Sequence, residues 1–399
     1  MKILFTHRYF WPDSPAYAAM LRTIAEHGAA QGHEVEVFAS QPSYGELSRA
    51  APRERVGGIA IRRVAVFRER KGSLLARGLN VAIYCARLFV HVLRSRPDIV
   101  TAATFPPVVA GWTASLAAKL VGARFIYHLQ DIHPEVSVFS GGRLGRGFLL
   151  RFLRSLDNQT LNRSAAIVVL SQDMAETLGH RRIARKLPIH TLNNFLLADF
   201  GEAANPPSEL RKPSGIRRFI FAGNLGKFQN LHLLVEGLVV CLDRRPDVEL
   251  LLLGEGEAKP SLQSRWGDHP RVRFGPYLPY AQAKELIAEA DVGLVSLTPD
   301  IYRVSYPSKV LTYIGLGLPM LALVEPGSQL AREIAENGIG AVPSEATPAA
   351  VADAADRLLT GAADRQAVGE YHRVKCSEER ILQQWDELLF VVGQATNTR

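Results

Sequence analysis

Cysteine is scarce in this sequence, with three residues in a chain of 399. Cys85, Cys241 and Cys376 are far apart and lie in none of the short Cys or His spacings that hold zinc. Their odd number and wide separation support neither a disulfide framework nor a zinc site. A reducing compartment fits this pattern, so we expect a cytoplasmic protein.

Long hydrophobic runs are also missing. The start of the chain turns polar after Ile3–Phe5, which is too short for the apolar core of a signal peptide and predicts a first strand instead. The longest apolar stretch, Leu79–Leu93, is interrupted by Asn80, Arg87 and His91. It falls short of the roughly 18 uninterrupted apolar residues of a spanning helix. We therefore expect that the chain does not cross a membrane.

The composition is that of a packed globular protein, with 47% hydrophobic and 22% charged residues. The net charge is +8, and several basic residues cluster in one stretch: Arg62, Arg63, Arg68, Arg70, Lys71 and Arg77. Segment 67–96 mixes basic with apolar residues, which predicts peripheral attachment to the inner face of an anionic membrane. The alternative is an ordinary core-facing helix with a basic outer face. We expect no nucleic-acid partner.

The length favours two domains, because a single core rarely grows to this size. Short apolar runs alternate with helical periodicity in both halves, which predicts parallel sheets covered on both faces. We predict the fold class α/β, with two Rossmann-like, doubly wound domains that face each other across a ligand-binding cleft. The predicted boundaries are 1–200 for the first domain, 201–217 for a Pro-rich linker and 218–377 for the second domain.

A helix start is predicted at Ser305–Val310, because Pro is favoured at the first helical position and Ser is a preferred cap. The first-turn amides of Ser308, Lys309 and Val310 would then be unpaired at the positive end of the helix dipole. Together with the charge of Lys309 they form an anion site that suits a diphosphate. The alternative is an ordinary capped helix with a solvated lysine.

Two glycine-rich turns follow predicted strands. The run Gly223–Lys227 lets backbone amides approach a phosphate, although a plain strand-to-helix turn is the alternative. The run Gly254–Glu257 resembles part of a dinucleotide fingerprint. It lacks the third glycine and carries two acids where phosphate would lie, so we reject it as a classical dinucleotide site.

Two histidines and two acids occur in His128–Glu135, at the predicted carboxyl end of a strand, where parallel sheets present functional groups. General acid or base groups can come from this segment. Asp131 is the strongest candidate, because an Asp in an apolar run needs a buried partner or a chemical role, although a capping Asp is the alternative. The histidine spacing matches no common zinc site, so we expect no metal.

At these segments the chain resembles the retaining GT-B glycosyltransferases of glycosyltransferase family four, and within it the bacterial surface-polysaccharide members of the colanic acid and O-antigen type. The resemblance covers nearly the whole chain. It rests on the following segments, in this order: Tyr9–Pro12, Gln130–Glu135, Gly223–Gly226, Pro307–Lys309, Tyr313, Gly317 and Pro319.

The resemblance implies that the first domain binds the acceptor and the second binds the nucleotide sugar. It also implies that a last helix, about 378–399, crosses back to the first domain. It implies transfer with retention, in which the leaving diphosphate accepts the acceptor's proton, without cofactor or metal. The predicted catalytic residues are Asp131, Lys227 and Lys309.

The predicted contacts with the donor and acceptor follow the same segments. The donor set is Gly223, Asn224, Gly226, Lys227, Glu255, Tyr277, Tyr306, Pro307, Ser308, Lys309, Val310 and Thr312. The acceptor side is Pro15, Ala16, Tyr17, His133 and Glu135. We expect UDP as the nucleotide, on family frequency alone, and a glycan or undecaprenyl-diphosphate-linked acceptor.

The sequence departs from the family pattern at five positions. Val304 and Thr312 stand where the family usually has two glutamates, the second of which binds the nucleotide ribose. The hydroxyl of Thr312 could make a weaker contact in its place. Asn224 and Gln229 replace the usual Arg and Lys, and Gln130 replaces a histidine. A nucleotide-sugar epimerase or phosphorylase of the same architecture, or a non-catalytic sugar-nucleotide binder, remains an alternative.

Overall fold

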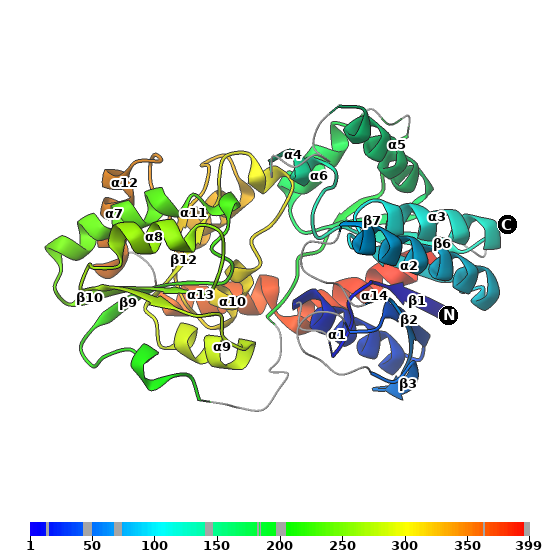
Figure 1. Cartoon of the computed structure of the whole chain (residues 1–399), viewed down its shortest axis with the longest axis horizontal. Helices are drawn as coiled ribbons and strands as arrows, with labels where there is room; N and C mark the ends of the chain where they lie inside the picture. Colours follow the sequence, from blue (N-terminus) through cyan, green and yellow to red (C-terminus); the bar gives the residue numbers. More distant parts are fainter. Residues whose placement is uncertain are drawn as a thin grey trace. The chain divides into compact units, whose positions relative to one another are not determined.

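The computed structural model describes residues 1–12, 16–42, 50–67, 74–139, 147–181, 183, 185–196, 205–361 and 364–394. The chain divides into two compact units (Figure 1). Unit 1 comprises Met1–Asn193 and Ile381–Arg399, and unit 2 comprises Asn194–Arg380. Each unit is built on its own mainly parallel sheet, so the predicted fold class of two doubly wound α/β parts is confirmed.

Unit 1 contains an eight-stranded sheet in the order β3-β4-β2-β1-β5-β6-β7-β8. Its strands are β1 (Lys2–Thr6), β2 (Glu34–Ser40), β3 (Arg53–Val56), β4 (Ile59–Val64), β5 (Ile99–Ala103), β6 (Arg124–His128), β7 (Ala166–Val169) and β8 (Ile189–Thr191). All neighbouring pairs are parallel except β3 and β4, which form an antiparallel hairpin at the edge. The sequence pattern did not predict this hairpin.

The helices of unit 1 are α1 (Ala16–Ala30), α2 (Leu74–Ser95), α3 (Val109–Val121), α4 (Glu135–Phe139), α5 (Gly147–Arg163), α6 (Gln172–Gly179) and α14 (Glu378–Gln394). Helices α2 and α5 both pack against α3. Gly122 adopts the left-handed conformation at the C-terminus of α3, a common helix end that glycine favours. Helix α14 joins unit 1 from Ile381 onward, and Asp386 bonds His27 of α1 at 2.8 Å.

Helix α2 is longer and more apolar than the sequence reading allowed. By length and composition, its segment Ala76–Ser95 could cross a membrane. In the structure, however, one face packs into unit 1, because Asn80, Tyr84, Leu88 and Val92 recur every four residues and are fully buried. The Asn80 side chain also bonds both backbone groups of Phe67 at 2.8 Å.

Unit 2 contains a six-stranded parallel sheet in the order β11-β10-β9-β12-β13-β14. Its strands are β9 (Arg217–Ala222), β10 (Val248–Leu253), β11 (Val272–Gly275), β12 (Val292–Ser296), β13 (Met320–Leu323) and β14 (Gly340–Ala341). The alternation of short apolar runs with helical periodicity that the sequence shows in its second half corresponds to strands β9 to β13 and the helices between them.

Helices cover both faces of this sheet: α7 (Leu231–Arg244), α8 (Lys259–Trp266), α9 (Tyr280–Ala288), α10 (Lys309–Gly315), α11 (Gln329–Asn337), α12 (Pro348–Leu359) and α13 (Arg365–Tyr371). Figure 1 shows α7 and α8 above β9 and β10, with α9 below them. A hydrophobic core lies on each face of the sheet, and successive residues of β9 point into opposite cores. Phe219 and Phe221 belong to one core and Ile220 to the other. The sheet is therefore buried on both faces.

The two glycine-rich turns of unit 2 interlock. The Gly223 amide donates to the Leu253 carbonyl at 2.9 Å, and the Leu225 amide donates to the Glu255 carbonyl at 2.8 Å. A Cβ atom added to Gly254 would lie 1.9 Å from the Gly223 carbonyl oxygen, and one added to Gly256 would lie 2.3 Å from that of Leu225. The glycines of Gly254–Glu257 thus allow the Gly223 turn to approach closely.

We predict that Gly254→Ala weakens unit 2 by about 2 kcal/mol or more, because backbone atoms must move and the new residue must hold a positive φ of 138°. Gly327→Ala is the control, since nothing lies within 4 Å of the added Cβ. Urea unfolding of both variants measures the difference. Equal stability of the two variants would contradict the interlocking.

Candidate functional site

The candidate donor site lies at the carboxyl ends of β9 and β12. In unit 2 the chain runs from β9 outward to β10 on one side and places β12 on the other. Such a reversal of strand order is where open α/β sheets bind ligands. The loop after β9 begins at Gly223, and the loop after β12 is tied to it, because the Thr298 amide donates to the Phe228 carbonyl at 2.8 Å.

The Gly223 turn carries several of the predicted donor contacts. Gly223 has a φ of 127°, which only glycine adopts without strain. The amide of Gly226 donates to the Gln229 side chain at 3.0 Å, and a Cβ on Gly226 would meet the Asn224 side chain. The turn is therefore narrow and held by its own side chains.

Lys227 follows this turn and is ion-paired with Glu257 at 2.8 Å. Both side chains are about two-thirds exposed, at 62% and 66%. An exposed pair of this kind contributes little free energy, so Lys227 can exchange its partner for a ligand phosphate.

Helix α10 begins where the sequence predicted. Its first residue is Lys309, Ser308 holds the cap position, and the helix has seven residues. Ser308 is exposed and its side chain makes no capping bond, so its predicted role as a hydrogen-bonding cap is wrong. The amide of Val310 donates to the Pro307 carbonyl at 3.0 Å, which also corrects the prediction of an unpaired amide at Val310.

Tyr313 joins α10 to the end of β9. Its hydroxyl donates to the Ile220 carbonyl at 3.3 Å and accepts from the Ala222 amide at 3.3 Å. The ring is fully buried and fills the space that a side chain at Gly293 would need. The helix start is thus positioned against β9 rather than free in a loop.

The ammonium of Lys309 points inward from α10. Its Nζ lies 3.2 Å from the centre of the Phe221 ring, in the last part of β9. The atom is buried and has no hydrogen-bond partner among the described residues. Burial lowers the pKa of Lys309 well below its usual range. The solvated lysine of the alternative interpretation is therefore wrong.

The remaining donor residues lie around this edge of the sheet or beyond it. Tyr306, Pro307 and Thr312 are half-buried. Glu255 pairs with Lys259 at 2.6 Å, while Tyr277, which follows β11, is 66% exposed. At the position of the family's first glutamate, Val304 is buried at 2% exposure, where a carboxylate would lose its solvation.

The second candidate site lies in unit 1 at the carboxyl ends of β1, β5 and β6, where the strand order reverses between β1 and β5. Asp131 is half-buried here. The Thr104 hydroxyl, after β5, accepts the amides of Gln130 at 2.8 Å and of Asp131 at 3.4 Å. This contact fixes the backbone that carries the Asp131 carboxylate.

A buried cluster of polar rings adjoins this segment. His128 Nδ1 lies 2.9 Å from the Tyr17 hydroxyl, and His128 Nε2 lies 2.9 Å from the side-chain amide nitrogen of Gln130. The amide nitrogen donates to Nε2, which leaves Nδ1 to donate to Tyr17. Tyr17 also packs edge-on against His7 at 4.8 Å, and Trp385 of α14 packs against His128 at 5.0 Å.

Both histidines of this cluster are uncharged. Burial lowers the pKa of His128 from 6.5 to about 3, and neighbouring His7 adds to the shift. Burial lowers the pKa of His7 to about 4, although its bond to the Tyr9 carbonyl opposes the shift. Tyr17 was among the predicted site residues, but neither histidine was. His7 follows the end of β1 and His128 ends β6, and this position was the signal in the sequence that could have found them.

The predicted acceptor residues beyond this cluster differ in their surroundings. Glu135 binds Arg181 at 2.7 Å and Arg154 at 3.0 Å, and Arg181 also donates to the His133 carbonyl at 3.0 Å. Glu135 therefore holds the segment after β6 in place. Burial lowers the pKa of His133, an effect that Asp131 and Glu135 oppose.

Two further points complete the set. Ala16 is the first residue of α1, and Pro15 lies outside the described residues. In the described part of the chain, no group of three or more His, Cys, Asp or Glu side chains could hold a metal ion.

We predict that stability falls as the pH drops below 6.5, because the unfolded chain then takes up protons that His7 and His128 refuse when folded. Between about pH 7 and pH 5 each of these histidines removes about 2 kcal/mol. In His128→Gln the loss should be about 2 kcal/mol smaller than in the wild type, as measured by urea unfolding at both pH values. The same loss in both proteins would show that His128 is charged when folded.

Family models match both units. A glycosyl transferase 4-like domain matches residues 16–194, and a glycosyl transferases group 1 domain matches residues 216–361. These matches cover the strands and turns that form the two candidate sites.

Known proteins are similar along much of the chain. WbjE of Pseudomonas aeruginosa, named a probable glycosyltransferase, is 27% identical over 68% of this chain and 69% of its own length. WcaI of Escherichia coli (strain K12), named as a glycosyl transferase of colanic acid biosynthesis, is 24% identical over 96% of this chain and 98% of its own length.

A solved structure shares the fold. HepE of Anabaena, in complex with UDP and glucose, matches with a TM-score of 0.65 and 17% identity, over 98% of this chain and 99% of its own. The two matched domain models and the two doubly wound units together show that this chain belongs to the GT-B glycosyltransferases.

Proposed function

We propose that the protein transfers a hexose or N-acetylhexosamine from a UDP-sugar to a glycan or lipid-diphosphate-linked acceptor, with retention of configuration, in surface-polysaccharide biosynthesis. The observation that carries this proposal is the Lys309 ammonium, which is buried beside the last residues of β9 and has no hydrogen-bond partner in the described part of the chain. A buried cation without a partner is costly, and an anion that reaches it would remove that cost.

A diphosphate is the anion that this edge of the sheet suits. The narrow Gly223 turn allows backbone to approach phosphate oxygens, and Lys227 can leave the exposed Glu257 for them. Lys309 would add charge from within the fold. UDP as the nucleotide is supported by the HepE structure, which holds UDP and glucose on a similar fold.

In the proposed reaction, the bond between the anomeric carbon and the diphosphate oxygen breaks, and a bond to the acceptor hydroxyl forms on the same face. The acceptor's proton passes to a diphosphate oxygen. Negative charge grows on the leaving group, so fixed positive charge near the phosphates lowers the barrier. Asp131 would orient the reacting sugar, from backbone that Thr104 holds. No step requires a metal ion or a cofactor.

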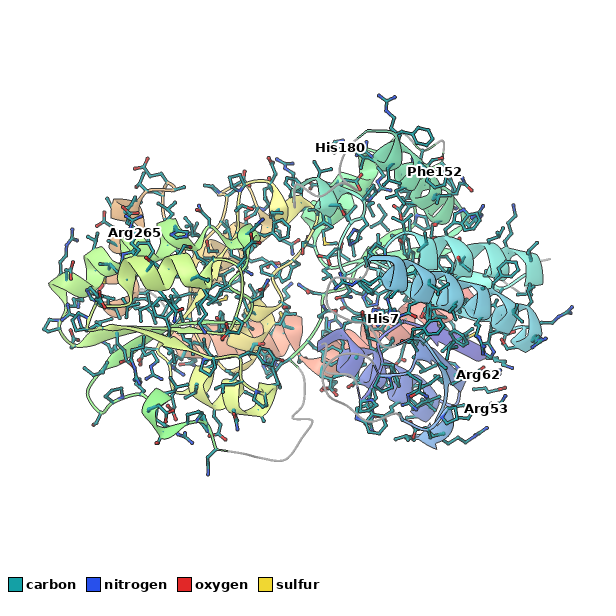
Figure 2. The ribbon with its side chains drawn as sticks, viewed as in Figure 1. His7, Arg53, Arg62, Phe152, His180 and Arg265 are labelled. Carbon is teal, nitrogen blue, oxygen red and sulfur yellow. The ribbon has the colours of Figure 1, made fainter. Side chains whose placement is uncertain are left out.

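We further propose that the protein works at the inner face of the cytoplasmic membrane. On α5, Phe148 is 83% exposed and Phe152 is 49% exposed, and their rings stack at 6.4 Å. Exposed Arg151 and Arg154 accompany them on the same helix (Phe152 is labelled in Figure 2). Aromatic rings flanked by arginine suit the boundary of an anionic bilayer. This surface fits better than segment 67–96, because α2 buries one face in unit 1.

We predict that Lys309→Met lowers kcat/KM about 100-fold to 1,000-fold, since it removes a preorganised charge from the leaving group. Because burial lowers the pKa of Lys309, wild-type affinity for UDP should fall with rising pH, at values where an ordinary lysine is still charged. Calorimetric titration with UDP across this range measures the effect, and the Lys309→Met profile should be flat.

Two further variants serve as comparisons for Lys309→Met. Lys375→Met, at an exposed lysine of unit 2, should leave UDP affinity and turnover unchanged. Asp131→Asn should lower turnover but keep UDP affinity, because Asp131 belongs to unit 1. Undiminished UDP affinity and turnover in Lys309→Met would refute the proposed donor site. UDP binding by the wild type without transfer or hydrolysis of a UDP-sugar would instead indicate a non-catalytic binder.

We predict that Phe148→Ser combined with Phe152→Ser lowers binding to phosphatidylglycerol vesicles at least about tenfold, since two exposed rings no longer insert. Cosedimentation at low salt measures it. Leu120→Ser is the control, because Leu120 is 61% exposed on α3, outside the aromatic pair. Equal binding by the double variant and the wild type would rule out α5 as the contact surface.

A further inference from the structure

A basic pocket of about 500 Å³ opens at the β3 edge of unit 1, between the β3–β4 hairpin and α2. Its lining includes Arg53 from β3, Arg62 from β4, and Arg87 and Arg94 from α2. Figure 2 labels Arg53 and Arg62, which lie at the same edge of the unit. Among the described residues, no Asp or Glu side chain lines this pocket.

The arrangement brings like charges together. Arg53 and Arg62 are directly opposite each other in the antiparallel β3–β4 ladder. Like charges at such positions repel, and Glu36 is the acid whose charge interacts with Arg62. Arg87 and Arg94 are exposed on the facing helix. Within the described ranges, Arg53, Arg87 and Arg94 form no ion pair or side-chain hydrogen bond.

Two other side chains of the lining, Arg63 and His91, already have partners. Arg63 is buried, pairs with Glu54 and donates to the Trp11 carbonyl at 2.8 Å. His91 pairs with Glu36 at 3.1 Å and stacks on Phe38 at 5.0 Å. Arg63 and His91 are therefore held by the protein itself, whereas Arg53, Arg87 and Arg94 are exposed.

A second pocket of unit 1 provides a comparison, because its lining arginines already have partners within the protein. It has a similar volume, about 500 Å³, and its lining includes Arg124 and Arg185. There, however, Arg185 donates to the carbonyls of Leu161 and Ser164. Arg124 has an interaction partner as well. Of these two pockets, the one at the β3 edge combines a similar volume with three arginines, Arg53, Arg87 and Arg94, that have no ion-pair or hydrogen-bond partner among the described residues.

We infer that the pocket at the β3 edge binds a phosphate ester. Arginine guanidinium groups match the planar spacing of phosphate oxygens, and several of them around one cavity can share a doubly charged group. A bound phosphate would also remove the repulsion between Arg53 and Arg62. The inference concerns unit 1 alone and does not depend on the donor site of unit 2.

The phosphate can come from a lipid headgroup or from a soluble molecule. Ala86 and Val90 lie on the α2 face that carries Arg87 and Arg94, and Val90 is 42% exposed. Such apolar side chains beside the charges can contact the acyl region of a lipid. The two sources share the same charged group and are separated by experiment.

The test compares two double variants of the full chain with equal loss of charge. Arg62→Gln with Arg87→Gln alters the pocket. Arg55→Gln with Lys119→Gln removes two exposed charges of unit 1 outside it. One arm titrates each protein with inorganic pyrophosphate, and the other measures binding to phosphatidylcholine vesicles with and without phosphatidylglycerol. Lys309→Met, measured beside them, accounts for pyrophosphate bound at the donor site.

We expect the pocket variant to bind one of the two probes roughly tenfold to thirtyfold more weakly, while the control variant keeps wild-type binding. Loss confined to pyrophosphate indicates a soluble phosphate ester, and loss confined to phosphatidylglycerol vesicles indicates a lipid headgroup. Equal losses in pocket and control variants, or no loss with either probe, would overturn the inference. Failure of the proposed transfer reaction would appear instead in Lys309→Met, whose pocket-dependent binding should persist.

Discussion

The proposed donor site depends on one unfavourable arrangement, a lysine ammonium held against an aromatic ring where no described side chain balances its charge. The fold maintains this arrangement because α10 is held in place separately. The Tyr313 hydroxyl bonds the backbone of Ile220 and Ala222 at the end of β9. The ring face offers Lys309 a weak attraction that does not replace a carboxylate. The free energy stored in this contact is available to an anion that approaches the end of β9, which links the packing of unit 2 to its chemistry.

The backbone conformation of the two glycine-rich turns determines how closely that anion can approach. Gly223 needs a left-handed φ, and Gly254 and Gly256 are needed because carbonyl oxygens of the neighbouring turn lie where their side chains would be. The Leu225 amide of one turn then donates to the Glu255 carbonyl of the other, which joins the loops that follow β9 and β10. Two glycine runs that look independent in the sequence thus form one structure, and the acids next to the glycines, Glu255 and Glu257, remain at the surface.

Much of the fold could be predicted from the sequence, because alternating strand and helix periodicity is a local signal. The start of α10 could be predicted from Pro307 just before it, although Ser308 makes no capping bond. The direction of the Lys309 side chain could not be predicted, since it depends on Phe221, far away in the chain. The ion pair of Glu135 could not be predicted either, because Arg181 is far away in the sequence and only the fold brings it next to Glu135. Local pattern identifies the element, while long-range packing decides which of its side chains remain available to a ligand.

The protein thus carries two kinds of uncompensated positive charge, and burial separates their uses. The ammonium of Lys309 is removed from water, so its field is strong at short range and weakly screened by salt. Arg53, Arg87 and Arg94 remain in contact with solvent, where each charge contributes little alone and several must act together. The first kind suits a leaving group whose charge grows during reaction. The second suits holding a molecule that already carries its charge, which is why the pocket at the β3 edge points to binding rather than to chemistry.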